Sequence, residues 1–289
     1  MKKGLQGSIL ITVLLPLLVI TQSCMVATKE IAITPQVIEK VGDKGKINWS
    51  EGYIEAIGIG TPPDRYIGTP HARPMALRAA RVDAYRNLLE ITTGVRVDST
   101  TVVKDVTVGN VLINTQVENL VKEAKIVNQE YMSDRTKLIV RMPMTGVFSQ
   151  IIMPKELDEQ SDAALPDVQV APAPVAVGYT GMVVDARGLE ALPAMCPKVI
   201  DESGREVYGS MNADRECAVQ QGMSGYAEDL TAAQSNPRVK NNPIIVKGIK
   251  TEGPGKSDIV ISNTDAEKIR SASDNLTFLK KCRVMIVLD

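Results

Sequence analysis

The residues that could do chemistry are few and lie far apart in the sequence. The only histidine, His71, lies in a proline-rich loop. Because no second histidine exists, the sequence argues against a histidine metal cage and against a catalytic triad, and we expect His71 on the surface. No C-x-x-C pair occurs, which excludes zinc ribbons and thioredoxin-like redox motifs.

Carboxylates at strand ends are the remaining candidates for catalysis. Asp64 follows the first expected strand, and Asp185 ends a later strand in "DARG", beside Arg187. Functional sites often lie at such strand ends, but a turn with an ion pair explains the same residues. We therefore predict no catalytic residue.

Two further stretches have residues of the kinds that bind ions or phosphate. The oxygen-rich "SNTDAE", Ser262 to Glu267, matches no calcium loop, and a capping box between Thr264 and Glu267 explains it. The glycines of "GIGTPPDR" complete no phosphate-binding motif, so we expect them to form a tight turn. The sequence thus predicts no metal, no cofactor and no enzyme.

Composition predicts a globular protein with an aliphatic core. Hydrophobic residues make up 44% and charged residues 23%, while aromatic residues are only 3%. The formal net charge of −1, without a basic run, argues against nucleic acid as a partner.

The elements that would position these residues form two small α+β domains. We expect a tether over 24–48 and a first domain over 49–154. Its elements alternate β-α-β-α-β-β: strand 53–59, an Ala-rich helix from Pro74 to Gly94, one or two strands in 95–108, helix 111–124, and strands 125–131 and 137–142.

A composition change marks the second domain. Residues 155–178, which include "APAPVAVG", predict an extended Pro/Ala-rich linker before a domain over 179–289. We expect a strand in "YTGMVVDARG", hairpins in 197–210 and 242–263, a helix through "YAEDLTAAQ", and a helix over 265–273. The continuous apolar run "CRVMIVLD" predicts a central strand covered on both faces.

The N-terminus reads as an export signal over residues 1–23. Lys2 and Lys3 precede an apolar run from Ile9 to Ile20, which is too short to span a bilayer. Cys24 follows Ser23, so we expect lipidation of Cys24, although secretory cleavage near Ala27 stays open. Met25 lacks the acidic character of an inner-membrane retention signal, which favours the outer membrane.

Three cysteines would remain in the mature chain. Cys196, Cys217 and Cys282 allow at most one disulfide and one free thiol, or three small buried apolar side chains. The sequence does not decide between these alternatives.

The stretch "ARPMALRAARVDAYRNLLEITTGVRVDSTTVV", residues 72–103, resembles the Lpp-twenty family of bacterial lipoproteins. It is also similar to the N-terminal domain of flagellar assembly protein T. The resemblance covers about residues 50–145 and is carried by the pattern Ala76, Ala79, Ala80, Asp83, Ala84, Asn87, Leu88, Glu90, Gly94, Val95 and Val97.

The resemblance implies a structural or assembly component of the envelope, lipid-anchored on the periplasmic face of the outer membrane. Its implied partners are that membrane and envelope or flagellar basal-body proteins, and self-association is left open. The alternative is a periplasmic ligand-binding protein that uses a cleft between the domains or the Asp185/Arg187 end of a sheet.

Overall fold

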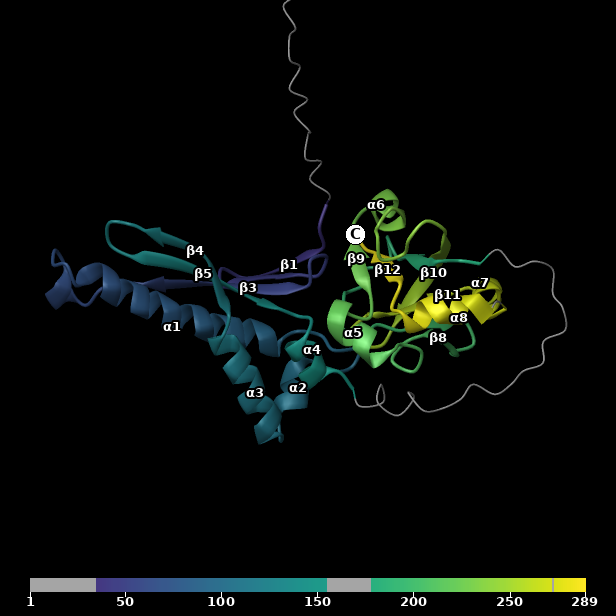
Figure 1. The fold of residues 1–289 in the computed structure, drawn as a ribbon, viewed down its shortest axis with the longest axis horizontal. Helices are drawn as coiled ribbons and strands as arrows, with labels where there is room; N and C mark the ends of the chain where they lie inside the picture. The colour runs from purple at the N-terminus through teal and green to yellow at the C-terminus, as the bar shows by residue number, and fades with distance from the viewer. Residues whose placement is uncertain (1–34, 155–177, 272) are drawn as a thin grey trace, which may run out of the picture. The chain divides into compact units, whose positions relative to one another are not determined.

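The structure is a computed structural model that describes residues 35–154, 178–271 and 273–289. Cys24, the expected signal peptide and residues 155–177 of the linker expected over 155–178 lie outside the described residues. We call residues 35–154 the N-terminal region and residues 178–289 the C-terminal region. Each holds one sheet with helices packed against it, so the fold class is α+β as predicted (Figure 1).

The sheet of the N-terminal region is antiparallel throughout, with the order β1-β2-β3-β5-β4. Its strands are β1 (Ile38–Val41), β2 (Gly45–Asn48), β3 (Tyr53–Gly60), β4 (Lys125–Tyr131) and β5 (Thr136–Pro143). Its helices are the 3-10 turn η1 (Asp64–Tyr66), α1 (Ala72–Thr93), α2 (Val103–Thr107), α3 (Val111–Lys122) and α4 (Val147–Ile152).

Helix α1 lies unusually close to strand β3, and two glycines allow it (Figure 1). A Cβ on Gly58 would lie 2.1 Å from the carbonyl oxygen of Ala80 and 2.3 Å from the amide nitrogen of Ala84. A Cβ on Gly60 would lie 2.2 Å from the carbonyl oxygen of Ala76. The tight turn predicted for these glycines is therefore wrong, because both lie inside the strand and serve helix–sheet contact.

The helix residues that the sequence singled out have structural partners. Ala76, Ala80 and Ala84 are buried against the sheet, whereas Ala79 is exposed. Asn87 donates from Nδ2 to the carbonyl of Ile57 at 2.8 Å, which ties the helix to the strand beneath it. Glu90 forms an ion pair with Lys44.

The sheet of the C-terminal region mixes parallel and antiparallel pairs in the order β8-β7-β11-β10-β6-β12-β9. Its strands are β6 (Gly181–Asp185), β7 (Val199–Asp201), β8 (Glu206–Tyr208), β9 (Gly225–Ala227), β10 (Pro243–Glu252), β11 (Asp258–Ile261) and β12 (Val284–Val287). Its helices are α5 (Arg215–Gln221), α6 (Leu230–Gln234), α7 (Asn263–Arg270) and α8 (Ser273–Lys280).

Strand β12 is covered on both faces, as its continuous apolar run predicts, but it is the sixth of the seven described strands and not a central one. It lies between β6 and β9 and is parallel to both. Its four residues are all buried. Met285 belongs to a small cluster with Ala233 of α6, whereas Ile286 points into the main core, so neighbouring residues serve opposite faces.

One apolar core draws on both regions. The buried side chains that form it include Ile54, Leu88 and Phe148 from the N-terminal region and Ile259, Ile269 and Phe278 from the C-terminal region. The described residues from 35 onward accordingly form one compact unit.

The tether expected over 24–48 is too long at its C-terminal end. Ile38–Val41 and Gly45–Asn48 pair as the hairpin β1–β2 and extend the N-terminal sheet. The hairpin was missed because β1 is a four-residue strand of alternately exposed and half-buried side chains, which gives little apolar periodicity.

The strands expected in 95–108 are also wrong in part. Only an isolated bridge between Arg96 and Val102 forms, and Val103–Thr107 becomes the short helix α2. Asp105 accepts a hydrogen bond from the backbone N–H of Val102 at 3.0 Å, and this cap starts a helix in spite of the β-branched residues.

Two helix predictions in the C-terminal region need correction. In "YAEDLTAAQ", Tyr226 and Ala227 belong to strand β9, and only Leu230–Gln234 is helical. Helix α7 is capped by Ser262, whose Oγ accepts from the Asp265 N–H at 3.0 Å, and not by Thr264.

Candidate functional site

The carboxylate that the sequence favoured most is held in an ion pair. Asp185 ends strand β6, and its Oδ1 and Oδ2 accept from Nε and Nη2 of Arg187 at 2.8 and 2.7 Å. These hydrogen bonds lower the pKa of the Asp185 carboxyl. Both carboxylate oxygens of Asp185 are occupied by Arg187, as the turn interpretation predicts, and the pair offers no general base with a raised pKa.

The other candidates lie apart from Asp185 and from one another. His71 stands at the N-terminal end of α1, where its ring contacts Tyr66 edge-on at 6.0 Å between centroids. Asp64 begins the turn η1, and Asp265 pairs with Lys268 on α7 at 2.9 Å. Within residues 35–154 and 178–289, no three His, Cys, Asp or Glu side chains gather in a way that could hold a metal ion.

The three cysteines of the described regions are free thiols. Cys196 and Cys282 are buried, and burial raises their pKa values to about 12 and about 11. Thiols with such pKa values carry almost no thiolate at neutral pH, so they behave as small apolar side chains.

Backbone and side-chain hydrogen bonds join the two regions. Arg96 donates from Nε to the carbonyl of Pro193 at 2.8 Å, and its own carbonyl accepts from the Met195 N–H at 3.0 Å. The Ser99 hydroxyl donates to Oδ2 of Asp258 at 2.6 Å. These contacts fix the two walls of a pocket at the junction.

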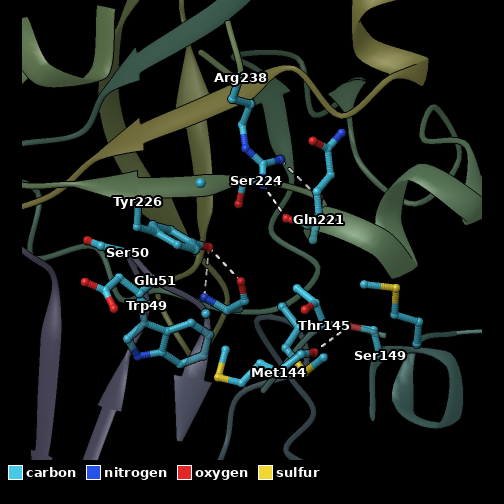
Figure 2. A pocket seen from close by; sticks show the side chains of 16 residues that line it. Trp49, Ser50, Glu51, Met144, Thr145, Ser149, Gln221, Ser224, Tyr226 and Arg238 are labelled. Carbon is cyan, nitrogen blue, oxygen red and sulfur yellow. Dashed lines mark hydrogen bonds between the residues drawn. The ribbon is translucent and has the colours of Figure 1, made fainter. Parts of the chain in front are cut away.

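The junction pocket has a volume of about 280 Å³ and takes its lining from both regions (Figure 2). We define it by Trp49, Glu51 and Met144 on one side and by Ser224, Tyr226 and Arg238 on the other. Figure 2 shows Arg238 beside Ser224 and Gln221, and Glu51 beside Ser50 and Trp49. The pocket therefore combines a cationic end, an acidic rim and apolar walls.

Two aromatic rings form the rigid part of the pocket wall. Trp49 and Tyr226 pack edge-to-face with 5.9 Å between their centroids, and both are buried. The Tyr226 hydroxyl donates to the carbonyl of Ala194 at 2.7 Å and accepts from its N–H at 3.0 Å. Burial raises the pKa of Tyr226 to about 12, so the hydroxyl stays protonated and its hydrogen bonds hold the ring against Ala194.

Sequence reasoning missed this pocket. Its residues come from five separate segments and carry no motif, and Arg238 follows a proline in an unremarkable polar loop. The one usable signal was Trp49, the only tryptophan of an aromatic-poor chain, because large aromatic side chains often lie in the core or at binding surfaces.

The N-terminal region also presents apolar side chains to solvent. Val108, Val111 and Leu112, which we call the apolar corner, surround the turn between α2 and α3 and are 69%, 79% and 77% exposed. All seven residues of the edge strand β4 are exposed as well. In the part of the chain that the structure describes, no helix is both long enough and apolar enough to cross a membrane.

Comparison with known proteins gives one partial match. Residues 181–289 match the family model for the second domain of Treponema pallidum Tp0624. The match starts at the first residue of β6 and covers the whole C-terminal sheet, which is less than half of the chain. No curated protein matches the chain.

Proposed function

We propose that this chain is a non-enzymatic structural or assembly component of the cell envelope, anchored by acyl chains on Cys24 to the periplasmic face of the outer membrane. The observation that carries the proposal is the apolar corner. Exposed apolar side chains that lie close together in sequence, as these three do, are the kind of surface from which protein-binding sites are built.

Local structure holds the apolar corner outward. Gly109 adopts a positive φ of 82°, and Asn110 caps α3 by accepting from the Ile113 N–H at 3.1 Å. The core-facing positions of the two helices are filled by other residues, namely Val103, Val117 and Val121. Val108, Val111 and Leu112 are therefore not needed for the core, which supports a role in binding a partner.

The anchor and the partner come from the sequence. The export signal and Cys24 support a lipid tether, and three acyl chains on one cysteine would make membrane binding effectively permanent. The resemblance of residues 50–145 to Lpp-twenty lipoproteins and to flagellar assembly protein T supports an envelope or basal-body protein as the partner. Self-association through the same surface is the second form of this proposal.

The first experiment tests the anchor. The mature protein is analysed by intact mass and by membrane fractionation, with the Cys24→Ser variant beside the wild type. We expect the wild type to carry the mass of three acyl chains and to sediment with membranes, and the variant to lose both properties. An unmodified wild-type N-terminus beyond Cys24, together with a wholly soluble protein, would refute the anchor.

The second experiment tests the apolar corner. We expect Val111→Ser combined with Leu112→Ser to remove in-cell crosslinks to the partner while unfolding as the wild type does, because both side chains are exposed. Met211→Ser, at a 59% exposed position in the C-terminal region, is the matched control and should keep the crosslinks. Crosslinks that persist in the double variant would contradict the proposal.

A further inference from the structure

We propose that the junction pocket binds a small monocarboxylate with an apolar chain, the carboxylate on Arg238 and Ser224 and the chain against Trp49 and the neighbouring methionines. This inference is independent of the assembly role, because it uses a different surface of the molecule.

Arg238 is a partly buried cation without a carboxylate partner in the described regions. Its Nη1 donates to the carbonyls of Gly222 and Cys282 at 3.1 and 2.8 Å, and its Nη2 donates to the carbonyl of Gln221. The carbonyls of Gln221 and Gly222 end helix α5, so part of the role of Arg238 is to cap that helix.

The cap leaves one edge of the guanidinium unused. Nε donates to no protein acceptor among the described residues, and Nη2 keeps a second N–H. A guanidinium that donates from Nε and Nη2 along one edge binds a carboxylate with two parallel hydrogen bonds, and both atoms of Arg238 keep donor capacity for this. Gly225 keeps this edge open, because a Cβ there would lie 3.1 Å from Nε.

Ser224 supplies a second, independent observation. Its hydroxyl oxygen is buried and has no hydrogen-bond partner of ordinary geometry among the described residues, although it approaches Tyr226 closely enough to lower the pKa of that phenol. A buried polar atom without a partner destabilises the protein, and most such atoms have one. Because no hydrogen bond of ordinary geometry holds the hydroxyl, it can rotate about χ1 towards an anion bound at Arg238.

The charge of the pocket selects a monoanion. Arg238 is the only Lys or Arg among the described lining residues, and Glu51 adds a negative charge at the rim. A phosphate dianion would meet one cation and one repelling carboxylate, whereas a carboxylate matches the single fork. Met144, Met153 and Met195 complete an adaptable apolar wall for the rest of the ligand.

The chain has a built-in reporter for this site. Trp49 is its only tryptophan and lines the pocket, so tryptophan fluorescence reports on pocket occupancy. The full-length protein is titrated with hexanoate and with hexanol, which share an apolar chain and differ in the carboxylate. We expect hexanoate to change the emission saturably and to bind at least about tenfold more tightly than hexanol, as expected for hydrogen bonds to charged groups.

Variants assign the carboxylate to its partners. Arg238→Gln should reduce hexanoate binding to the level of hexanol, and Ser224→Ala should weaken hexanoate alone by about threefold or more. Ser235→Ala, at an exposed position outside the pocket, should bind both probes as the wild type does. If loss of the α5 cap unfolds Arg238→Gln, then Ser224→Ala decides, since its hydroxyl makes no hydrogen bond of ordinary geometry within the described residues.

Three results would overturn the proposal. The first is no emission change with hexanoate at millimolar concentration, and the second is equal affinity for hexanoate and hexanol. The third is wild-type hexanoate affinity in Ser224→Ala or in a folded Arg238→Gln variant. None of them bears on the anchor or the apolar corner, so the two proposals fail separately.

Discussion

The contact between β3 and α1 makes Gly58→Ala the sharpest test of the fold. The new Cβ would lie 2.1 Å from the carbonyl oxygen of Ala80 and 2.3 Å from the amide nitrogen of Ala84. Both atoms belong to the backbone of a 22-residue helix, so no rotation of a side chain can relieve the clash. Helix and strand must move apart instead.

The size of the effect follows from that geometry. Adding one methyl group to a well-packed core costs about 1–3 kcal/mol of unfolding free energy when side chains can adjust. Here the backbone must shift and the buried contacts of Ala80 and Ala84 with the sheet are weakened, so we expect about 3 kcal/mol or more. That loss would lower the urea midpoint by about 1 M or more.

The assay is urea unfolding followed by Trp49 emission and by far-UV circular dichroism. Gly94→Ala is the matched control, because Gly94 has φ of −86° and its nearest neighbour to an added Cβ is 3.5 Å away. We expect the control to stay within about 0.5 kcal/mol of the wild type. Similar midpoints for Gly58→Ala and Gly94→Ala would refute the close contact of α1 with β3.

Three further changes test other parts of the structure. Burial raises the pKa of Asp258, which means that the folded protein binds this proton more tightly than the unfolded chain does. The wild type should therefore lose stability as pH rises through that folded-state pKa. Asp258→Asn should flatten this part of the pH–stability curve. Hydrogen bonds, led by that from the Ser203 hydroxyl, lower the pKa of buried Asp201. The contribution of Asp201 to the unfolding free energy is therefore complete above about pH 4 and is lost as pH falls further. Thermal unfolding of Asp201→Asn should lack this loss of stability in acid. Ser262→Ala should cost about 1 kcal/mol in urea unfolding and Thr264→Ala much less, and the reverse order would contradict the observed cap.

Long periodic segments were predictable from the sequence, and short ones were not. Helix α1 and strands β3 and β5 follow from apolar spacing, and β12 from its continuous apolar run. Hairpin β1–β2 and helix α2 have four or five residues per element, too few for a period to stand out. In α2, a local cap outweighed the strand preference of its valines.

The glycines of β3 show why local patterns mislead. Gly58 and Gly60 resemble turn residues when only their neighbours in sequence are considered. Their role depends on a helix that begins several residues later and returns along the strand, and only tertiary structure brings the two together. The alanines of α1 did predict part of this contact, because small residues on one face of a helix allow it to pack closely against a sheet.

The junction pocket was beyond sequence reasoning for the same reason. Trp49, Ser224 and Arg238 are joined only when the two regions pack on a shared core. The sequence did single out Asp185 and Arg187, but these neutralise each other in an ion pair. The informative residues were a cation and a hydroxyl whose hydrogen bonding capacity is incompletely used, a property that no motif encodes.

The place of β12 bears on how the polypeptide matures. It is the last described strand of its sheet in chain order, yet β6 and β9 both pair with it, and β9 has no other neighbour among the described strands. As a chain emerges from its N-terminus, the sheet must wait for residues 284–287 before β6 gains its second neighbour. Completion of the C-terminal sheet therefore depends on residues 284–287, whereas every strand of the N-terminal sheet lies before residue 144 and can pair earlier.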